Sequence, residues 1–283
     1  MARQHPSLVI GAGIAGIIAL LVILAPWLST HDVERMDMRN RFAGPSWEHI
    51  LGTDNFGRDL WSRMLHGGRI SLSIAVLSVS AAAVIGTLFG LAAGYFGGWI
   101  DLIAMRVVDI FLGFPALILA LALVAALGPG ITNVAAALIM VFWAEYARVV
   151  RAITLSIREQ PYITAARSTG ATHSRIILRE ILPNAAGPII VLATLGLGVA
   201  VIAESALSFL GFGVPPPTPT WGWTLAYGAR FLRQDPWLST VAGLAIMITV
   251  LGFNLLGDGL RDLFDPRQLT RNAANGARQG TAP

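Results

Sequence analysis

The 283-residue chain contains no cysteine and no lysine. The absence of cysteine excludes disulfides, thiolate metal sites and cysteine nucleophiles. All 20 basic residues are arginine, so the chain lacks both the lysine of a P-loop and any Schiff-base lysine. Charged residues make up only 13% of the chain, about half the share typical of soluble domains. This composition is that of a membrane protein.

Hydrophobic residues make up 55% of the chain, and the mean hydropathy is +0.66. A helix needs about 20 apolar residues to cross a hydrocarbon core of about 30 Å. The first apolar run, which Arg3 precedes, is longer than the apolar region of a signal peptide, so we expect an uncleaved anchor. Six stretches are long enough to span a membrane: residues 8–28, 70–97, 100–127, 131–152, 187–212 and 238–260.

An even number of spans places both termini on the same side. With cytoplasmic termini, twelve arginines would lie inside and eight outside, which favours this orientation. The pI of about 10.3 would also suit nucleic-acid binding. Because the arginines are scattered among membrane-like segments, we instead expect them at the membrane surface and facing protein partners.

A stripe of small residues runs along the second span, where Gly86, Gly90, Gly94 and Gly98 recur at every fourth position. Such a stripe lets the backbone of another helix approach closely. Packing inside the bundle is the favoured interpretation, and an interface between subunits is the alternative.

Two segments outside the spans have recognisable patterns. The first, residues 51–69, predicts an amphipathic helix in the membrane surface with Asp54 as its N-cap. The second, residues 214–223, contains four prolines and is expected to be extended, with Trp221 and Trp223 at the membrane–water interface. It is either a rigid lip or a simple loop. The apolar face of the first segment would carry Phe56, Leu60, Trp61, Met64 and Leu65.

A polar, arginine-bearing segment separates the fourth and fifth spans. Pro161 suits the first turn of a helix, and Gly170 interrupts the run. A second helix is expected over residues 172–182, with Pro183 as its stop and with Ile177, Leu178, Ile181 and Leu182 along one side. Two short helices joined at a glycine form either an interfacial element with solvated arginines or a knob that docks into another protein.

Ionisable residues inside spans are costly and are candidates for function. Asp109 follows Arg106 by three residues, and Arg148 follows Glu145 by three, so we expect two structural ion pairs. Glu204 stands alone among small residues near one end of the fifth span. It would either line a translocation pathway or accept hydrogen bonds from residues 205–223.

The segment TAARSTGATHSRIILREILPN, residues 164–184, resembles the EAA loop of ABC-importer permeases. Thr164 stands where that family usually has glutamate, so the corresponding acidic contact is either lost or partly replaced by the hydroxyl. Three further segments, residues 51–72, 204–225 and 254–267, resemble the C-type permease of dipeptide and oligopeptide importers. Nickel and glutathione importers share them, so the solute is not specified. The positions that match the loop pattern are Ala165, Ala166, Gly170, Ile181, Leu182 and Pro183.

The resemblance implies an all-α polytopic membrane protein with six transmembrane helices and the type I ABC importer permease fold. It divides the chain into residues 1–68, a type-1 core over residues 69–258 with a coupling loop at 153–183, and a cytoplasmic tail over 259–283. Coupling to the ATPases would run through residues 161–183. The implied coupling residues are Thr164, Ala165, Ala166, Gly170, Ile177, Ile181, Leu182 and Pro183, and Glu204 and Asp109 are the candidates for the translocation path.

The partners implied by the resemblance are a homologous B-type permease, two ABC ATPases or one fused ATPase, an extracytoplasmic substrate-binding protein and membrane lipid. ATP and Mg²⁺ would be bound by the ATPases in the bacterial inner membrane complex, a heterotetramer. This chain is expected to have no catalytic residue, no cofactor and no metal site. Export of peptides by related machinery is a less favoured alternative.

Two other classes of membrane protein are rivals. An intramembrane enzyme would need a convergent constellation at bilayer depth, whereas all five histidines fall outside the six predicted spans. A self-contained channel or secondary transporter usually shows broken helices or repeats, whereas these spans are uninterrupted except at Pro115.

Overall fold

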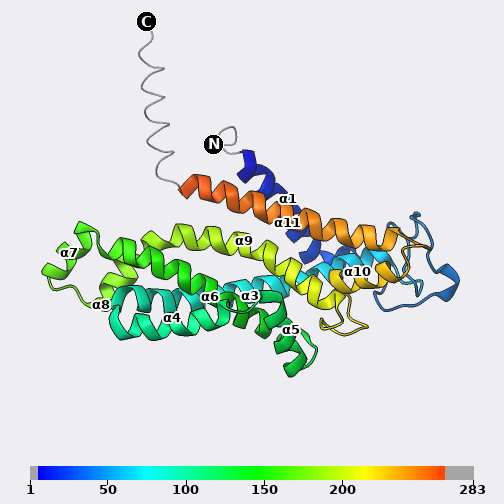
Figure 1. Cartoon of the computed structure of the whole chain (residues 1–283). Coiled ribbons are helices and arrows are strands. Elements are labelled where there is room, and N and C mark those ends of the chain that lie inside the picture. Colours follow the sequence, from blue (N-terminus) through cyan, green and yellow to red (C-terminus); the bar gives the residue numbers. More distant parts are fainter. Residues whose placement is uncertain (1–5, 265–283) are drawn as a thin grey trace, which may run out of the picture.

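The computed structural model describes residues 6–264, and every regular element in that range is a helix. Figure 1 shows an elongated bundle with the cap, defined here as residues 29–59 and 210–236, at one end and α7 and α8 at the other. The all-α polytopic fold is confirmed. The long helices are α1 (Pro6–Ile23), α3 (Leu60–Phe96), α6 (Ile131–Arg158), α9 (Leu182–Phe209) and α11 (Trp237–Phe264); the shorter ones are α2 (Ala25–Leu28), η1 (Met38–Asn40), α4 (Gly98–Leu112), α5 (Ala116–Leu127), α7 (Pro161–Ser168), α8 (His173–Arg175), the π-helix η2 (Ile176–Ile181) and α10 (Trp221–Arg230).

Five helices of the described range are long and apolar enough to cross a membrane, and a sixth span results if the bent pair α4–α5 counts as one. The predicted span over residues 100–127 is this bent pair, and the interruption expected at Pro115 is an 87° bend between α4 and α5. Pro115 lies between the two helices with extended ψ and has no N–H to continue the helical ladder. The proline therefore breaks the span at this point.

The predicted surface helix over residues 51–69 is also wrong. Residues 51–59 form a loop, and α3 begins at Leu60 and continues without a break into the second span. Its N-cap is Asp59, whose side chain accepts a hydrogen bond from the Ser62 N–H at 2.8 Å, and not Asp54. The helix crosses the expected domain boundary at residue 69, and α11 extends to Phe264 before the part of the tail that lies outside the described residues.

The polar residues that suggested a solvated helix face are buried in the cap. Asp54 accepts hydrogen bonds from the Arg58 N–H and, at 2.7 Å, from the Arg58 Nε, and its Oδ2 lies 3.5 Å from the Arg63 Nε. Burial raises the pKa of Asp59, but hydrogen bonds from Ser62 and His49 outweigh it and hold that pKa below its usual value. The cap thus folds over the start of α3 around buried carboxylates.

The glycine stripe of α3 packs against α6 inside the chain, which confirms the favoured interpretation for three of its four members. A Cβ on Gly86 would lie 2.4 Å from the Tyr146 Cβ, and one on Gly90 would lie 2.7 Å from the Ala147 carbonyl oxygen. Gly94 meets Thr154 in the same way. Gly98 does not belong to the stripe, because it starts α4 with φ +55° and faces open space.

We expect Gly90→Ala to destabilise the protein by about 1–3 kcal/mol, the usual effect of an extra methyl group in a packed core. The helix backbones of α3 and α6 must separate, since the nearest atom is a carbonyl oxygen rather than a flexible side chain. Gly16→Ala in α1 is the matched control, because a Cβ there meets nothing within 4 Å. Thermal unfolding of the two variants in detergent tests this, and equal midpoints would contradict it.

The proline-rich segment is non-helical up to Thr220, but it bends at Val214 and turns at Pro216 and Pro217 instead of staying extended. The expectation for residues 221–223 is wrong, because α10 starts at Trp221 with the Thr220 hydroxyl accepting from the Trp223 N–H. Trp221 is buried and donates its indole N–H to the Met64 carbonyl at 2.9 Å, so it anchors the cap to α3 instead of lying at a membrane surface. Gly67 allows this docking, since a Cβ there would lie 3.2 Å from the Thr220 backbone.

Candidate functional site

The segment between α6 and α9 folds into a compact projection, called the knob here and comprising residues 161–181. Figure 1 shows it at the end of the bundle opposite the cap. Gly170 adopts φ +78°, and the Gly170 and Ala171 N–H groups donate to the carbonyls of Arg167 and Ala166 at 3.0 and 3.1 Å. These bonds form a Schellman motif, which requires a left-handed residue at the Gly170 position. The expected glycine turn between two helices is present.

Three buried isoleucines fix the knob to the bundle. Ile163, Ile176 and Ile181 are fully buried and pack with Leu91 of α3 and Val150 of α6. The expected apolar side of Ile177, Leu178, Ile181 and Leu182 is therefore wrong in part: Ile176 replaces Ile177 at its centre, and Leu178 is 61% exposed. The buried pair is spaced i,i+5 because the segment is a π-helix.

Pro183 does not stop the helix. Residues 173–209 form one helical run, and the Leu182 N–H donates to the Ile177 carbonyl across the wider π turn. Pro183 lies in the first turn of α9, where its missing N–H is tolerated because the ladder has already changed register. A π segment inside a helical run is a common feature of functional sites.

The residues predicted to couple to an ATPase divide into an anchored and an exposed set. Ile181 is buried, and Ala166, Ile177 and Leu182 are half-buried. Thr164 and Ala165 lie on the exposed side of α7, with Gly170 exposed at the turn and Pro183 exposed at the start of α9. The knob thus exposes the outer side of α7 and the glycine turn, while its buried apolar residues hold it against the bundle.

A hydrogen bond from α3 to the knob was not foreseen from the sequence. The Tyr95 hydroxyl lies 2.8 Å from the His173 Nδ1, and the Arg167 guanidinium lies over the Tyr95 ring at 5.4 Å. Arg158 at the end of α6 donates to the Gly94 carbonyl at 2.9 Å. Nothing in the spacing of these residues indicates that they meet.

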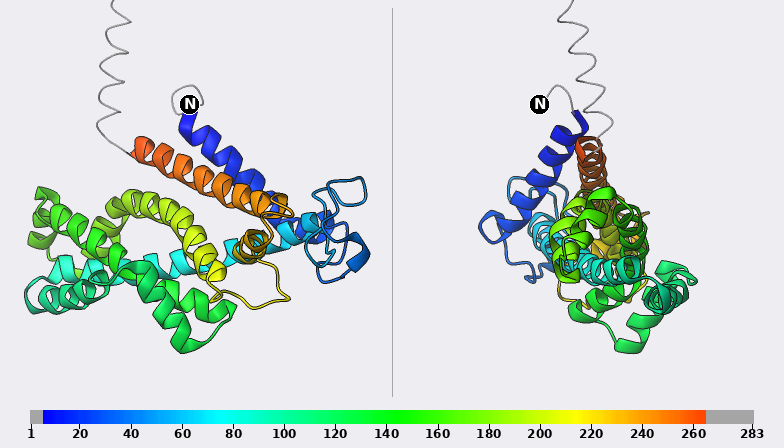
Figure 2. Two further views of the ribbon diagram at one scale, coloured as in Figure 1. Left: turned by 45° about the vertical axis from the view of Figure 1, so that its right-hand side comes forward. Right: turned by 90° about the vertical axis from the view of Figure 1, so that its left-hand side faces the viewer.

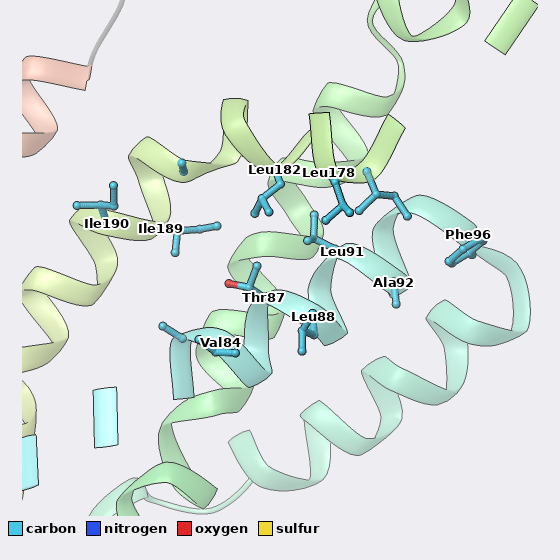
Figure 3. A pocket seen from close by; sticks show the side chains of 13 residues that line it. Val84, Thr87, Leu88, Leu91, Ala92, Phe96, Leu178, Leu182, Ile189 and Ile190 are labelled. Atoms are coloured by element: carbon cyan, nitrogen blue, oxygen red, sulfur yellow. The ribbon is translucent and has the colours of Figure 1, made fainter. Parts of the chain in front are cut away.

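Next to this anchor, an apolar hollow of about 530 Å³ separates α3 from the π segment and the first half of α9. Figure 3 shows Val84, Leu88 and Ala92 on one side and Leu182 and Ile189 on the other. In Figure 2 the same half of α9 arches away from the bundle; Pro188 lies inside this helix. The knob is therefore held to α3 by the contact of Tyr95 with His173, while the first half of α9, which follows the knob, lies over a hollow.

The ion pairs inside the spans join different helices. Asp109 of α4 pairs with Arg148 of α6 at 2.5 Å, so the predicted partners within each helix, Arg106 and Glu145, are wrong. One turn away, Arg151 donates to both oxygens of Asp101, with Nη2 2.5 Å from Oδ2. The side chains of Asp109 and Arg148 are more than half exposed, which shows that this face of α4 and α6 is uncovered in the single chain.

Glu204 is fully buried in α9. Its Oε1 accepts a hydrogen bond from the Ser208 hydroxyl at 2.8 Å, whereas its Oε2 has no partner within the described residues. The burial favours the structural alternative over a position on a pathway. The donor, Ser208, lies within the expected residues 205–223, in the last turn of α9.

Two family models match the chain. The first, that of binding-protein-dependent transport system inner membrane components, covers residues 86–270. It contains the knob, the ion pairs and Glu204. The chain belongs to this family. The second, the N-terminal transmembrane domain of oligopeptide transport permease C, covers residues 2–45 and identifies the permease as a C-type subunit of an ABC transporter.

Relatives of two kinds resemble the permease over most of its length. It is 44% identical to the dipeptide transport system permease protein DppC of Alkalihalophilus pseudofirmus over 94% of this chain and 87% of that protein. It is 43% identical to the glutathione transport system permease protein GsiD of Escherichia coli over 94% and 88% of the two chains. A crystal structure of an amino acid ABC transporter with histidines shares the fold, with a TM-score of 0.54 at 20% identity over 70% of this chain and 91% of that one.

Proposed function

We propose that the permease imports dipeptides and oligopeptides, forms half of the translocation pathway and couples to ATPase partners through residues 161–183. Its relatives support a multi-pass inner-membrane importer subunit of this class. Glutathione is the second candidate solute, because the glutathione permease GsiD is nearly as similar as the dipeptide permease DppC. Nickel chelates and peptide export are less favoured.

The knob is the observation that supports the coupling role. Thr164, Ala165 and Gly170 are exposed on an element that buried isoleucines hold rigidly at its base. A rigid element transmits the movement of a partner protein to the helix that follows it. The π segment and the apolar hollow would let the first half of α9 move together with the knob. ATP and Mg²⁺ belong to the partner ATPases, since this chain has no lysine for a P-loop.

A homologous permease subunit is proposed to cover the face of α4 and α6. Charged residues in membrane spans normally face a bundle interior or a water-filled cavity. In the single chain the half-exposed side chains of Asp109 and Arg148 face neither a bundle interior nor an enclosed cavity. A second permease packed against this face would enclose them. The extracytoplasmic substrate-binding protein would then meet the cap, at the end opposite the knob, with both termini cytoplasmic.

A single engineered cysteine tests the coupling role, because the chain has none of its own. We expect Thr164→Cys, labelled with a short photo-crosslinker in the assembled transporter, to form a covalent product with an ATPase subunit. Met38→Cys in the cap is the matched control, with an exposed side chain at the other end of the molecule. Mass spectrometry of the products identifies each partner.

A product with the ATPase from Met38→Cys, or its absence from Thr164→Cys and Ala165→Cys alike, would contradict the proposal. The same pair of variants tests orientation. In intact cells a membrane-impermeant thiol reagent should label the cap position but not the knob position.

A further inference from the structure

Three potential metal ligands come together in the cap, although the sequence analysis expected no metal site. One ring nitrogen of His31, one of His49 and one carboxylate oxygen of Glu48 all lie within 4.8 Å of one another. The two imidazole rings are tilted by 33° with centroids 4.7 Å apart. Sixteen residues of chain lie between His31 and Glu48, so the fold of the cap brings the set together.

Both histidines are held in place by the N-terminus of α3. The His49 Nδ1 lies 2.9 Å from Oδ1 of Asp59, and the His31 Nδ1 lies 3.7 Å from the same oxygen. The backbone N–H of His31 donates to the Ser62 hydroxyl at 3.2 Å, and the backbone N–H of His49 donates to the Ser46 hydroxyl at 3.0 Å. The His31 Nδ1 also lies 3.0 Å from the Thr30 hydroxyl. The rings are therefore positioned by bonds that do not involve their other nitrogens.

The contact of His49 with Asp59 has the form that orients metal-binding histidines. Such histidines usually donate one ring N–H to a carboxylate, which fixes the tautomer and leaves the other nitrogen as the ligand. The Asp59 side chain is fully buried, while the His49 and His31 side chains are 12% and 26% exposed. A buried carboxylate thus contacts partly exposed rings, and the third side chain, Glu48, is exposed.

The space and the charge around the three side chains suit a cation. They line a hollow of about 90 Å³, roughly three water volumes, which also contains Arg35, Asp37 and Asn40. The carboxylates of Asp37, Glu48 and Asp59 outnumber the one guanidinium. Asp37 already accepts hydrogen bonds from Arg39 and Asn40, so Glu48 is the carboxylate that is free to rotate toward the rings.

We propose that His31, Glu48 and His49 bind a zinc-class divalent metal ion that joins the segment after α2 to the turn at residues 46–49. Two imidazoles and a carboxylate are a zinc ligand set, with water in the fourth position, and Mg²⁺ and Ca²⁺ prefer oxygen ligands alone. With ligand bonds of about 2.0–2.2 Å the donor atoms must approach to about 3.3 Å. This approach requires rotation of the exposed Glu48 side chain and a small closure of the two partly exposed imidazole rings toward each other. This inference does not depend on the transported solute or on coupling to an ATPase.

The experiment uses the full-length permease, purified in detergent through an affinity tag that contains no histidine and stripped with a chelator. We expect one Co²⁺ per chain, detected by the visible bands of tetrahedral cobalt, and displacement of that ion by stoichiometric Zn²⁺. Zn²⁺ is also expected to raise the thermal unfolding midpoint, because it binds the folded cap more tightly than the unfolded chain.

His49→Gln should weaken Zn²⁺ binding by more than about 100-fold, beyond the 10- to 100-fold typical when an outer partner of a ligand is lost. Glu48→Gln, on an exposed side chain that leaves the cap folded, should weaken it at least about tenfold. His66→Gln is the matched control, since His66 lies in α3 outside the hollow and should leave affinity unchanged.

Three results would overturn the inference: no stoichiometric Co²⁺ bands, Zn²⁺ affinity unchanged in His31→Gln/His49→Gln, or an equal loss in His66→Gln. If His49→Gln fails to fold, Glu48→Gln decides the question. If that variant keeps both its Zn²⁺ affinity and its Zn²⁺-dependent shift of the unfolding midpoint, Glu48 is not a ligand. The proposal is then refuted.

Discussion

Dipeptide uptake by a Gly170→Val permease is expected to fall at least about tenfold, while the protein still reaches the membrane at a normal level. Gly170 closes the Schellman motif at φ +78°, and a β-branched residue held there costs about 1–3 kcal/mol. Each 1.4 kcal/mol is a factor of ten in the population of the native turn. A Cβ at this position meets nothing within 4 Å, so the effect comes from the backbone and not from a clash.

The readout is uptake of a labelled dipeptide by reconstituted transporter, measured together with ATP hydrolysis. ATP hydrolysis that continues without uptake is expected, because the turn lies outside the membrane spans and the spans stay folded. Gly170→Asn is the matched control, since asparagine tolerates the left-handed conformation and should keep most of the uptake. Equal uptake by the valine variant and the natural chain would contradict the role of the turn.

Hydropathy was sufficient to predict the membrane spans, because a run of about 20 apolar residues has few other stable locations. The start of α3 was misplaced because an apolar stripe with polar residues opposite has two possible explanations. The polar face can be solvated, or it can be buried against the chain's own loop. Asp54, Arg58 and Arg63 are buried in the cap with one another as partners, and no local pattern reveals that.

The knob was predictable as two helices joined at Gly170, because glycine turns and proline starts act within a few residues. Its interior was not. The π segment places Ile176 and Ile181 on one side, and an α-helical periodicity assigns Ile177 in place of Ile176. The contact of Tyr95 with His173 joins residues 78 positions apart, and nothing in the sequence alone places them together.

The ion pairs show the same limit of local spacing. Residues three apart in a helix predict Arg106 for Asp109, whereas the close packing of α3, α4 and α6 supplies Arg148 from another helix. The two ion pairs differ in how far their side chains are exposed, so their loss should have different effects. Asp101 and Arg151 are 20% and 31% exposed, whereas Asp109 and Arg148 are 53% and 54% exposed.

Removing one member of the Asp101–Arg151 pair is expected to destabilise the permease by about 1.5–3 kcal/mol, since a two-point charged hydrogen bond is lost and the remaining charge stays in the span without a partner. Asp101→Asn and Arg151→Gln should each lower the thermal unfolding midpoint in detergent. The double variant should recover most of the loss, because no uncompensated charge remains. The interaction energy of this double-mutant cycle is the measured quantity, and strict additivity of the single effects would contradict the pair.

The Asp109–Arg148 pair supplies the comparison. In the single chain it is exposed enough for Asp109→Asn to change the unfolding midpoint little, since exposed pairs contribute about 0–1 kcal/mol. In the assembled transporter the same variant should lower uptake without lowering stability if this face lines the pathway. A loss of assembly with the second permease would instead make the pair part of the interface. Either result separates it from Asp101–Arg151, whose loss should destabilise the chain before any partner binds.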